Sequence, residues 1–254
     1  MSDEPLIAEL DGVALAYRDE GPRDGAPVLL VHGFASNMHV NWYLTSWVEM
    51  LTDAGRRVVA FDNRGHGGSQ AFHDPADYGP DIFARDSVAL LDRLGIGDAD
   101  VVGYSMGARI GFAMAAWHGA RVRRLALCGM GANLFGSGRD NEIVAQVLEA
   151  DDPEAFGDPA AMTFRRFAER TGSDLRALAA CIRPSAVKLT PDLTSLVTAP
   201  TIVAVGGDDD VAGPAEPLAG MLPRGEAFTV PGRDHMKSTG DPALKRAVLE
   251  FLER

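Results

Sequence analysis

The sequence predicts an α/β fold: a mostly parallel, twisted sheet with helices on both faces. From residue 28 onwards, short apolar runs alternate with longer segments whose apolar residues have helical spacing. Runs such as Val28–Val31 and Val58–Phe61 are apolar at every position, which is typical of strands covered on both faces. Several of these runs end in glycine-rich loops. Because ligands bind at the carboxyl ends of parallel strands, these loops mark where a site is expected.

Before this alternating part, the chain has two short strand-like segments, at residues 6–10 and 13–17. The pair Asp11-Gly12 joins them. An Asp-Gly pair between two such runs is a strong signal for a tight turn between antiparallel strands. We therefore expect a β-hairpin at the start of the fold.

The alternating part predicts four buried strands and three helices up to residue 131. Strands are expected at 28–31, 56–61, 101–102 and 125–128, and helices at 42–52, 82–94 and 106–118. Right-handed crossovers place the helices on both faces of the sheet. The loops that follow the strands, at 32–37, 62–69, 103–107 and 129–131, should then lie together at one edge.

The pattern changes between residues 132 and 196. Amphipathic helices are expected at 141–150, 159–170 and 174–182, with no convincing strand between them. We interpret 132–196 as a helical lid inserted into an α/β core made of residues 1–131 and 197–254. The alternation resumes after the insertion, with strands at 201–205 and 227–230 and helices at 214–221 and 242–252.

Composition limits the class of protein. The 254 residues fit one domain carrying an insertion, and 46% apolar with 24% charged residues is ordinary for a globular protein. The net charge of −12 argues against nucleic acid or an anionic membrane surface as the main partner. No apolar run approaches the roughly 20 residues that span a bilayer. The acidic start differs from a signal peptide, so we expect a cytoplasmic protein.

The two cysteines, Cys128 and Cys181, lie in apolar surroundings. Two cysteines provide neither a disulfide framework nor a cysteine zinc site, so we expect buried free thiols. The sequence shows no phosphate-binding loop, and we expect neither a cofactor nor a bound metal. Nothing in the sequence predicts the oligomeric state.

The sequence Gly103-Tyr104-Ser105-Met106-Gly107 lies between an apolar strand end and a helix start. A serine on such a sharp turn takes a strained backbone conformation, and small residues two before and two after it let the chains pass. The turn would lift the Ser105 hydroxyl above the sheet. The helix N-terminus would point the Met106 N–H toward the same space, where it could stabilise an oxyanion. We therefore treat Ser105 as a candidate nucleophile.

A serine hydroxyl is a weak nucleophile until a neighbouring base accepts its proton. Of the six histidines, only His235 follows a late predicted strand in a loop that leads into the last helix. The base in turn needs a carboxylate to hold its tautomer. The loop Gly206–Gly213 supplies three adjacent aspartates, Asp208, Asp209 and Asp210. These could also bind a metal, but no histidine or spaced acid accompanies them.

The chain resembles the α/β-hydrolase-fold serine hydrolases, in particular the small bacterial carboxylesterases, from about residue 10 to the C-terminus. The resemblance is weakest in 132–196. It rests on five motifs in order: His32-Gly33-Phe34, Asp62-x-Arg64-Gly65-x-Gly67-x-Ser69, Gly103-x-Ser105-x-Gly107, the acidic loop 206–213, and Gly232-x-x-His235. The order serine, acid, histidine is that of the family.

The resemblance implies roles for further residues. Phe34 follows His32-Gly33 and would supply the second oxyanion N–H beside Met106. The family acid lies three residues after a glycine at the strand end, which selects Asp209 from Gly206 or Asp210 from Gly207. Family strands of this kind run six residues from an opening proline, here Pro200, so Asp209 is favoured over Asp210, and Asp208 is the least favoured.

The resulting prediction is a cofactor-independent serine hydrolase that cleaves carboxylic esters of small molecules through an acyl-enzyme. Ser105 would attack, His235 would transfer the proton and Asp209 would orient His235. The same triad could act instead on a thioester, a lactone, an amide or a carbon–carbon bond beside a carbonyl. A ligand receptor that keeps a hydrolase pocket with slow turnover is the alternative from another class. Halide-releasing and epoxide-opening relatives have an aspartate at the position of Ser105.

Overall fold

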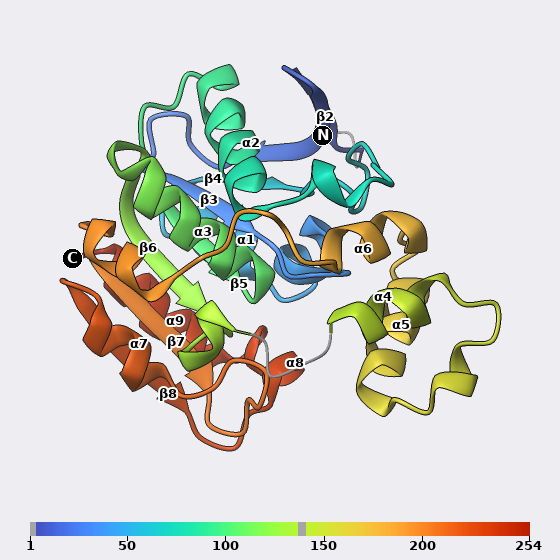
Figure 1. The fold of residues 1–254 in the computed structure, drawn as a ribbon. Coiled ribbons are helices and arrows are strands. Elements are labelled where there is room, and N and C mark those ends of the chain that lie inside the picture. Colours follow the sequence, from blue (N-terminus) through green and yellow to red (C-terminus); the bar gives the residue numbers. More distant parts are fainter. Residues whose placement is uncertain (1–3, 137–140) are drawn as a thin grey trace.

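The computed structural model describes residues 4–136 and 141–254. Its centre is an eight-stranded sheet in the order β1-β2-β4-β3-β5-β6-β7-β8 (Figure 1). The strands from β3 to β8 run parallel, whereas β2 is antiparallel to both β1 and β4. The strands are β1 (Leu6–Leu10), β2 (Val13–Glu20), β3 (Pro27–Val31), β4 (Arg57–Phe61), β5 (Ala99–Tyr104), β6 (Val122–Cys128), β7 (Thr201–Gly206) and β8 (Gly225–Val230). The predicted, mostly parallel α/β sheet is confirmed.

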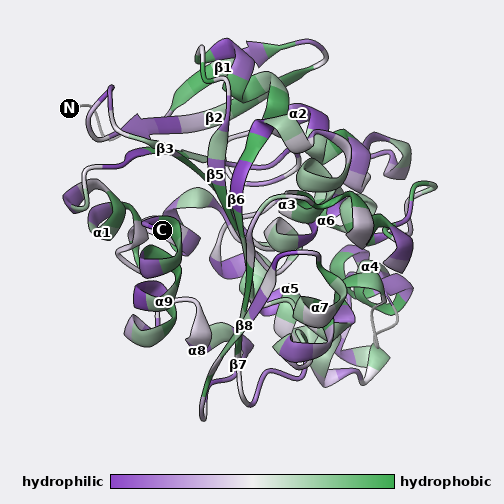
Figure 2. Cartoon of the chain, turned by 90° about the vertical axis from the view of Figure 1, so that its left-hand side faces the viewer, coloured by the Kyte–Doolittle hydropathy of each residue, from purple (hydrophilic) through white to green (hydrophobic). Residues whose placement is uncertain are grey.

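Helices connect the parallel strands and flank the sheet. The α-helices of the described residues are α1 (Trp47–Asp53), α2 (Pro80–Arg93), α3 (Met106–Trp117), α4 (Asn141–Glu149), α5 (Pro159–Arg170), α6 (Leu175–Ile182), α7 (Ala215–Met221), α8 (His235–Ser238) and α9 (Pro242–Leu252). Figure 2 shows α1 and α9 on one side of the sheet and α2, α3 and α7 on the other. The two-faced arrangement follows from right-handed crossovers between parallel strands.

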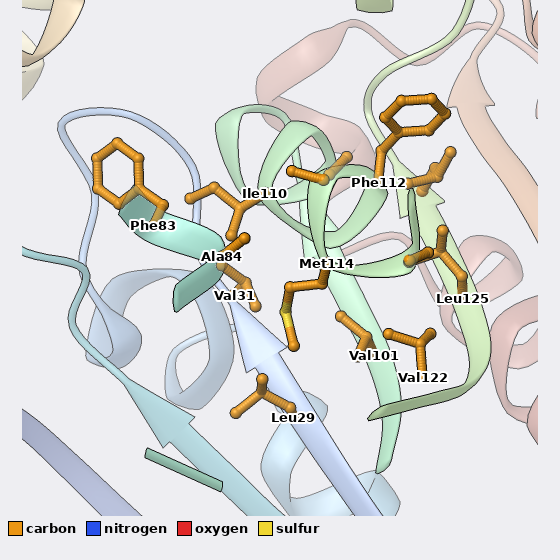
Figure 3. Close-up of a cluster of buried hydrophobic side chains, with 14 of the residues drawn as sticks. Leu29, Val31, Phe83, Ala84, Val101, Ile110, Phe112, Met114, Val122 and Leu125 are labelled. Atoms are coloured by element: carbon orange, nitrogen blue, oxygen red, sulfur yellow. The ribbon is translucent and has the colours of Figure 1, made fainter. Parts of the chain in front are cut away.

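Each face of the sheet buries its own apolar cluster. Because successive side chains of a strand point to opposite faces, Leu29 packs with α2 and α3 whereas Leu30 packs with α1 and α9. Figure 3 shows Met114 of α3 lying over Leu29 of β3 and Val101 of β5. This packing fixes α3, and with it the turn before α3, relative to the sheet.

The predicted helix at 42–52 is wrong in its first half. Residues His39–Tyr43 form a short π-helical segment, and the α-helix begins only at Trp47. Ser46 separates them with a left-handed backbone, at φ 56°. A single left-handed residue interrupts the α-helical hydrogen-bond ladder, and apolar spacing alone does not reveal it.

The helices α4, α5 and α6 lie between β6 and β7 in the chain and form a group beside the sheet (Figure 1). They share an apolar cluster that includes Leu148 and Leu178. This cluster also takes in Ala35 and Phe34 from the loop after β3, and the Phe34 and Phe164 ring centroids are 5.7 Å apart. Residues 137–140 of the predicted lid 132–196 lie outside the described residues.

Two further sequence expectations concern membrane spans and cysteines. In the part of the chain that the structure describes, no helix has the length and apolar character needed to cross a bilayer. Cys128 and Cys181 are both free thiols, but only Cys128 is buried as expected, whereas Cys181 is half-buried.

Candidate active site

Ser105 occupies the turn between β5 and α3 with φ 56° and ψ −110°. A non-glycine residue with positive φ is strained, and such strain persists only where the surroundings hold it. The Ser105 N–H donates to the Cys128 carbonyl at 2.8 Å, which ties the turn to β6. A Cβ at Gly103 would overlap the Gly107 carbonyl, and one at Gly107 would overlap the Val31 carbonyl. Both positions therefore require glycine for the reason that the sequence suggested.

The structure brings Ser105, His235 and Asp209 together. Oγ of Ser105 lies 3.0 Å from Nε2 of His235. Nδ1 of His235 lies 2.8 Å from Oδ2 and 3.0 Å from Oδ1 of Asp209. Since a carboxylate accepts the proton of Nδ1, the Nε2 lone pair is left to accept from the serine hydroxyl. The geometry is that of a nucleophile, a base and an orienting acid.

Asp209 is the one of the three adjacent aspartates that contacts the histidine. Its side chain is fully buried. Oδ1 also accepts the N–H groups of Val211 at 3.1 Å and Ala212 at 2.8 Å, so the loop after β7 wraps around the carboxylate. Asp208 and Asp210 are exposed. These contacts hold a negative charge beside the imidazole, where it can stabilise the imidazolium form.

His235 is the first residue of α8, a four-residue helix that periodicity could not predict because it is too short. Asp234 caps this helix, with its carboxylate accepting the Lys237 N–H at 2.9 Å. Tyr104, directly before the serine, donates its hydroxyl proton to the His235 carbonyl, and the two ring centroids lie 5.4 Å apart. Tyr104 therefore links the serine turn to the histidine loop, a role that the sequence analysis missed.

Phe34 and Met106, the two residues predicted to supply oxyanion N–H groups, line the same cavity as Ser105. Met106 begins α3, where a backbone N–H has no acceptor within the helix. The loop that carries Phe34 passes close to the serine turn. An added Cβ at Gly33 would lie 3.4 Å from the Ser105 Cβ. Both loops thus reach the space above the serine.

The loops after β3 and β4 are joined by hydrogen bonds. Nε2 of His32 accepts the Asn63 N–H at 2.9 Å, while its Nδ1 lies 2.8 Å from the Gly33 carbonyl. Asp62 accepts the N–H groups of Met38 at 2.7 Å and Gly68 at 2.8 Å. The glycine-rich loop 62–69 therefore positions the backbone of the loop that carries Phe34.

Two buried histidines lie beside Phe34. Burial lowers the pKa of His32 to about 4 and that of His66 to about 3. The His66 ring contacts both the His32 ring and the Phe34 ring edge to face, with centroids 5.2 Å and 5.9 Å apart. Both imidazoles are neutral at pH 7. His32 forms hydrogen bonds through both ring nitrogens, whereas His66 does so through Nδ1, which lies 3.0 Å from the Arg64 carbonyl.

A cavity of about 940 Å³ opens above Ser105. Its walls come from the sheet side, including Phe34 and Met130, and from α4–α6 and their connections, including Phe164 and Ile182. The volume is at the upper end of the range for small-molecule sites, about 300–1,000 Å³. Arg109 also lines the cavity and was not among the predicted site residues. Its signal in the sequence is that it is the one charged residue in an otherwise apolar helix, α3.

Within residues 4–136 and 141–254, no group of three or more His, Cys, Asp or Glu side chains is arranged to hold a metal ion. The three adjacent aspartates do not share one site, because Asp209 is buried against His235 whereas Asp208 and Asp210 are exposed. The chemistry that this site can perform with its own groups is nucleophilic attack by a serine hydroxyl with proton transfer through histidine.

Comparison with known proteins defines the class. The family model for the alpha/beta hydrolase fold matches residues 26–181. The chain therefore belongs to the α/β-hydrolase family and is a hydrolase of this fold.

Individual relatives differ in their reactions. The chain is 31% identical to the dihydrolipoyllysine-residue acetyltransferase component of the acetoin cleaving system of Pseudomonas putida, over 98% of this chain and 70% of that protein. It is 38% identical to 2-hydroxymuconate semialdehyde hydrolase of Pseudomonas sp. (strain CF600), over 46% of this chain and 40% of that protein. The crystal structure of the enol-lactonase from Burkholderia xenovorans LB400 matches 98% of this chain and 100% of its own, with TM-score 0.82 and 25% identity.

Proposed function

We propose that this protein is a serine hydrolase that cleaves carboxylic esters through an acyl-enzyme. The observation that carries the proposal is the continuous hydrogen-bond chain from Oγ of Ser105 through His235 to the buried Asp209. A serine with this pair of neighbours loses its proton to the imidazole as it attacks a carbonyl carbon.

The proposed reaction runs in two halves. Oγ of Ser105 bonds to the acyl carbon while Nε2 of His235 takes its proton, and the N–H groups of Phe34 and Met106 hold the oxyanion. His235 returns the proton to the leaving alkoxide as the ester C–O bond breaks. Water then attacks the acyl carbon while His235 takes its proton. As the bond between the acyl carbon and Oγ breaks, His235 returns the proton to Oγ, which releases the acid and restores Ser105.

Residues 132–196 are proposed to act as a lid over this site. Support comes from the cavity, whose walls include Phe164 of α5 and Ile182 of α6 opposite Ser105. A lid of this kind would exclude water around the acyl-enzyme and would carry much of the substrate preference.

A lactone is the second candidate substrate, supported by the likeness of the whole chain to the Burkholderia xenovorans enol-lactonase. A lactone is a cyclic ester, so the same attack by Ser105 opens the ring, and the leaving alkoxide stays attached to the acyl group. A thioester, an amide or a carbon–carbon bond beside a carbonyl would use the same first step.

The proposal is tested with a panel of short p-nitrophenyl esters, thioesters and lactones assayed on the wild-type protein and on Ser105→Ala. We expect ester hydrolysis by the wild-type protein and a loss of at least about 10³-fold in kcat for the variant. An alanine variant with wild-type rates would exclude the mechanism. Stoichiometric labelling of Ser105 by a fluorophosphonate, together with negligible turnover across the panel, would instead support the slow-turnover receptor.

A further inference from the structure

Arg109 is a cation placed close to the proposed nucleophile. It lies four residues after Ser105 and is the single charged residue of α3. Residues i and i+4 share a helix face, and a rise of about 1.5 Å per residue puts their Cα atoms about 6 Å apart along the axis. Arg109 and Ser105 both line the cavity. A molecule of a few carbon atoms could therefore contact both side chains.

The Arg109 guanidinium is held by two backbone carbonyls and has no acidic partner among the described residues. Nη2 donates to the carbonyls of Asn133 at 2.7 Å and Gly136 at 2.8 Å. Within residues 4–136 and 141–254, Nε and Nη1 have no hydrogen-bond partner and no carboxylate forms an ion pair with this side chain. Burial lowers the pKa of Arg109. Since a guanidinium stays protonated at neutral pH, the cavity contains a positive charge that no carboxylate of the described residues compensates.

The other charged residues of the cavity do not balance Arg109. Arg183 is paired with Glu149, with Nη2 2.7 Å from Oε2. Oδ1 of Asp158 accepts the first N–H groups of α5, and Asp210 is exposed. Lys188 is also exposed on the cavity wall and forms no ion pair among the described residues. The interior of the cavity is therefore more positive than the rest of this protein, whose net charge is −12.

A partly buried cation without a counter-ion costs free energy unless a ligand supplies the charge. Nη2 is occupied by the two carbonyls, so the free N–H groups of Nη1 are those that can donate a charge-assisted hydrogen bond to a carboxylate oxygen. The cavity wall is mostly apolar, with Phe83, Met130 and Phe135 among its members, and suits a hydrocarbon segment. The ligand that fits both features is an acyl compound with an anionic group at one end.

We infer that the substrate of this site is an ester or lactone that carries a carboxylate group, and that Arg109 binds this carboxylate while Ser105 attacks the acyl carbon. The inference rests on the proposed serine hydrolase and narrows its substrate class to monoesters of dicarboxylic acids or carboxylated lactones. Hydrolysis of such a monoester releases the alcohol and leaves a dicarboxylate. Arg109 then acts as a specificity-determining residue that orients the acyl chain over Ser105.

The test compares monomethyl glutarate with methyl pentanoate, which has the same carbon chain length but no charge, in a pH-stat assay. We expect the wild-type protein to prefer the anionic ester. Arg109→Gln keeps much of the size but removes the charge, and it should lower the ratio of the two kcat/KM values about 10–100-fold. Arg109→Lys should restore part of the ratio. Arg170→Gln, an exposed residue away from the cavity, is the control for net charge and should keep the wild-type ratio.

A binding measurement separates this inference from the proposed function. Glutarate should raise the melting temperature of Ser105→Ala, and it should not do so when Arg109→Gln is added. Equal kcat/KM for the two esters, or equal effects of Arg109→Gln and Arg170→Gln on the ratio, would overturn the carboxylate site while the serine hydrolase stands. If neither ester is hydrolysed, the proposed function fails, and the glutarate shift still decides whether Arg109 binds carboxylates.

Discussion

At the scale of single residues, the three adjacent aspartates have the same side chain in three different environments. Asp209 is buried and receives two backbone N–H groups as well as the His235 Nδ1 proton. Asp208 and Asp210 face solvent. Which of them meets His235 depends on the turn after β7, where Gly206 ends the strand and accepts the Asp209 N–H at 3.2 Å.

Single substitutions distinguish the role of Asp209 from that of Asp210. We expect Asp209→Asn to lower kcat by up to about 10⁴-fold, because an amide cannot stabilise the imidazolium and favours the wrong histidine tautomer. Asp210→Asn should stay within about threefold of wild type, since exposed substitutions away from the reacting groups have small effects. Steady-state ester hydrolysis at pH 7 measures both. Small and equal losses would show that neither carboxylate orients His235.

Tyr104 is expected to act through the position of His235. Tyr104→Phe keeps the ring contact and removes the hydroxyl that donates to the His235 carbonyl. A net hydrogen bond of this kind corresponds to a fall in kcat of about 2–10-fold, with KM unchanged. A rise in KM at constant kcat would instead place Tyr104 in substrate binding.

At the scale of elements, the strands and the serine turn follow from local patterns, but several details need tertiary contacts. Apolar runs predicted β3 to β7 because strands covered on both faces are apolar throughout. The interruption at Ser46 and the short helix α8 could not be predicted, since one left-handed residue and four helical residues leave no periodic signal. The role of Arg109 could not be predicted, because the absence of a counter-ion among its described neighbours depends on the folded chain.

The two buried histidines make the loops after β3 and β4 sensitive to acid. In the unfolded chain a histidine binds a proton below a pKa of about 6.5. In the folded protein His32 does so only near 4 and His66 only near 3. Since the unfolded state then binds more protons than the folded state, the free energy of unfolding falls as the pH drops from 7 toward 4.

This loss should amount to about 2 kcal/mol for each of the two histidines between pH 7 and pH 5. His66→Asn removes the titrating group and retains an N–H that can donate to the Arg64 carbonyl, as Nδ1 of His66 does at 3.0 Å. Urea unfolding of wild type and variant at both pH values should show a smaller pH effect in the variant by about 2 kcal/mol. The same pH effect in both proteins would contradict a neutral buried His66.

At the scale of the whole molecule, a buried cluster of ion pairs stabilises the end of the sheet opposite the site. Asp100 of β5 is fully buried and pairs with Arg56 before β4 and with Arg123 of β6, the latter at 2.9 Å. Arg56 also donates to the Leu252 carbonyl of α9 at 3.3 Å. One carboxylate thus joins two neighbouring strands, the start of a third and the last helix.

Removing this carboxylate should destabilise the entire fold. Asp100→Asn leaves two arginines without their buried partner, and we expect the free energy of unfolding to fall by about 3–5 kcal/mol. Asp98→Asn is the matched control, because Asp98 is half exposed and 3.8 Å from Arg123. Its effect should stay below about 1 kcal/mol. Comparable losses in the two variants, measured by urea unfolding, would show that the buried cluster contributes little.

The site combines loops of the common sheet with side chains of the inserted helices. Membership of the family therefore does not identify the substrate or the bond that is cleaved. The serine turn, the histidine loop and the acid loop all follow parallel strands of the sheet, whereas the cavity wall opposite them comes from α4–α6. In the proposed function, the first set carries out the chemistry and the second carries much of the substrate preference. Side-chain directions within the insertion depend on its own packing, which apolar spacing does not specify.

The acyl-enzyme is tested most directly by the initial phase of p-nitrophenyl acetate hydrolysis in a stopped-flow experiment. A covalent intermediate on Ser105 predicts a burst of p-nitrophenolate that approaches one equivalent per protein chain when deacylation is the slower step, together with an acetyl adduct on the peptide that contains Ser105. Ser105→Ala should give neither burst nor adduct. Turnover by the wild-type protein with no adduct on Ser105, or an undiminished burst in Ser105→Ala, would contradict the proposed mechanism.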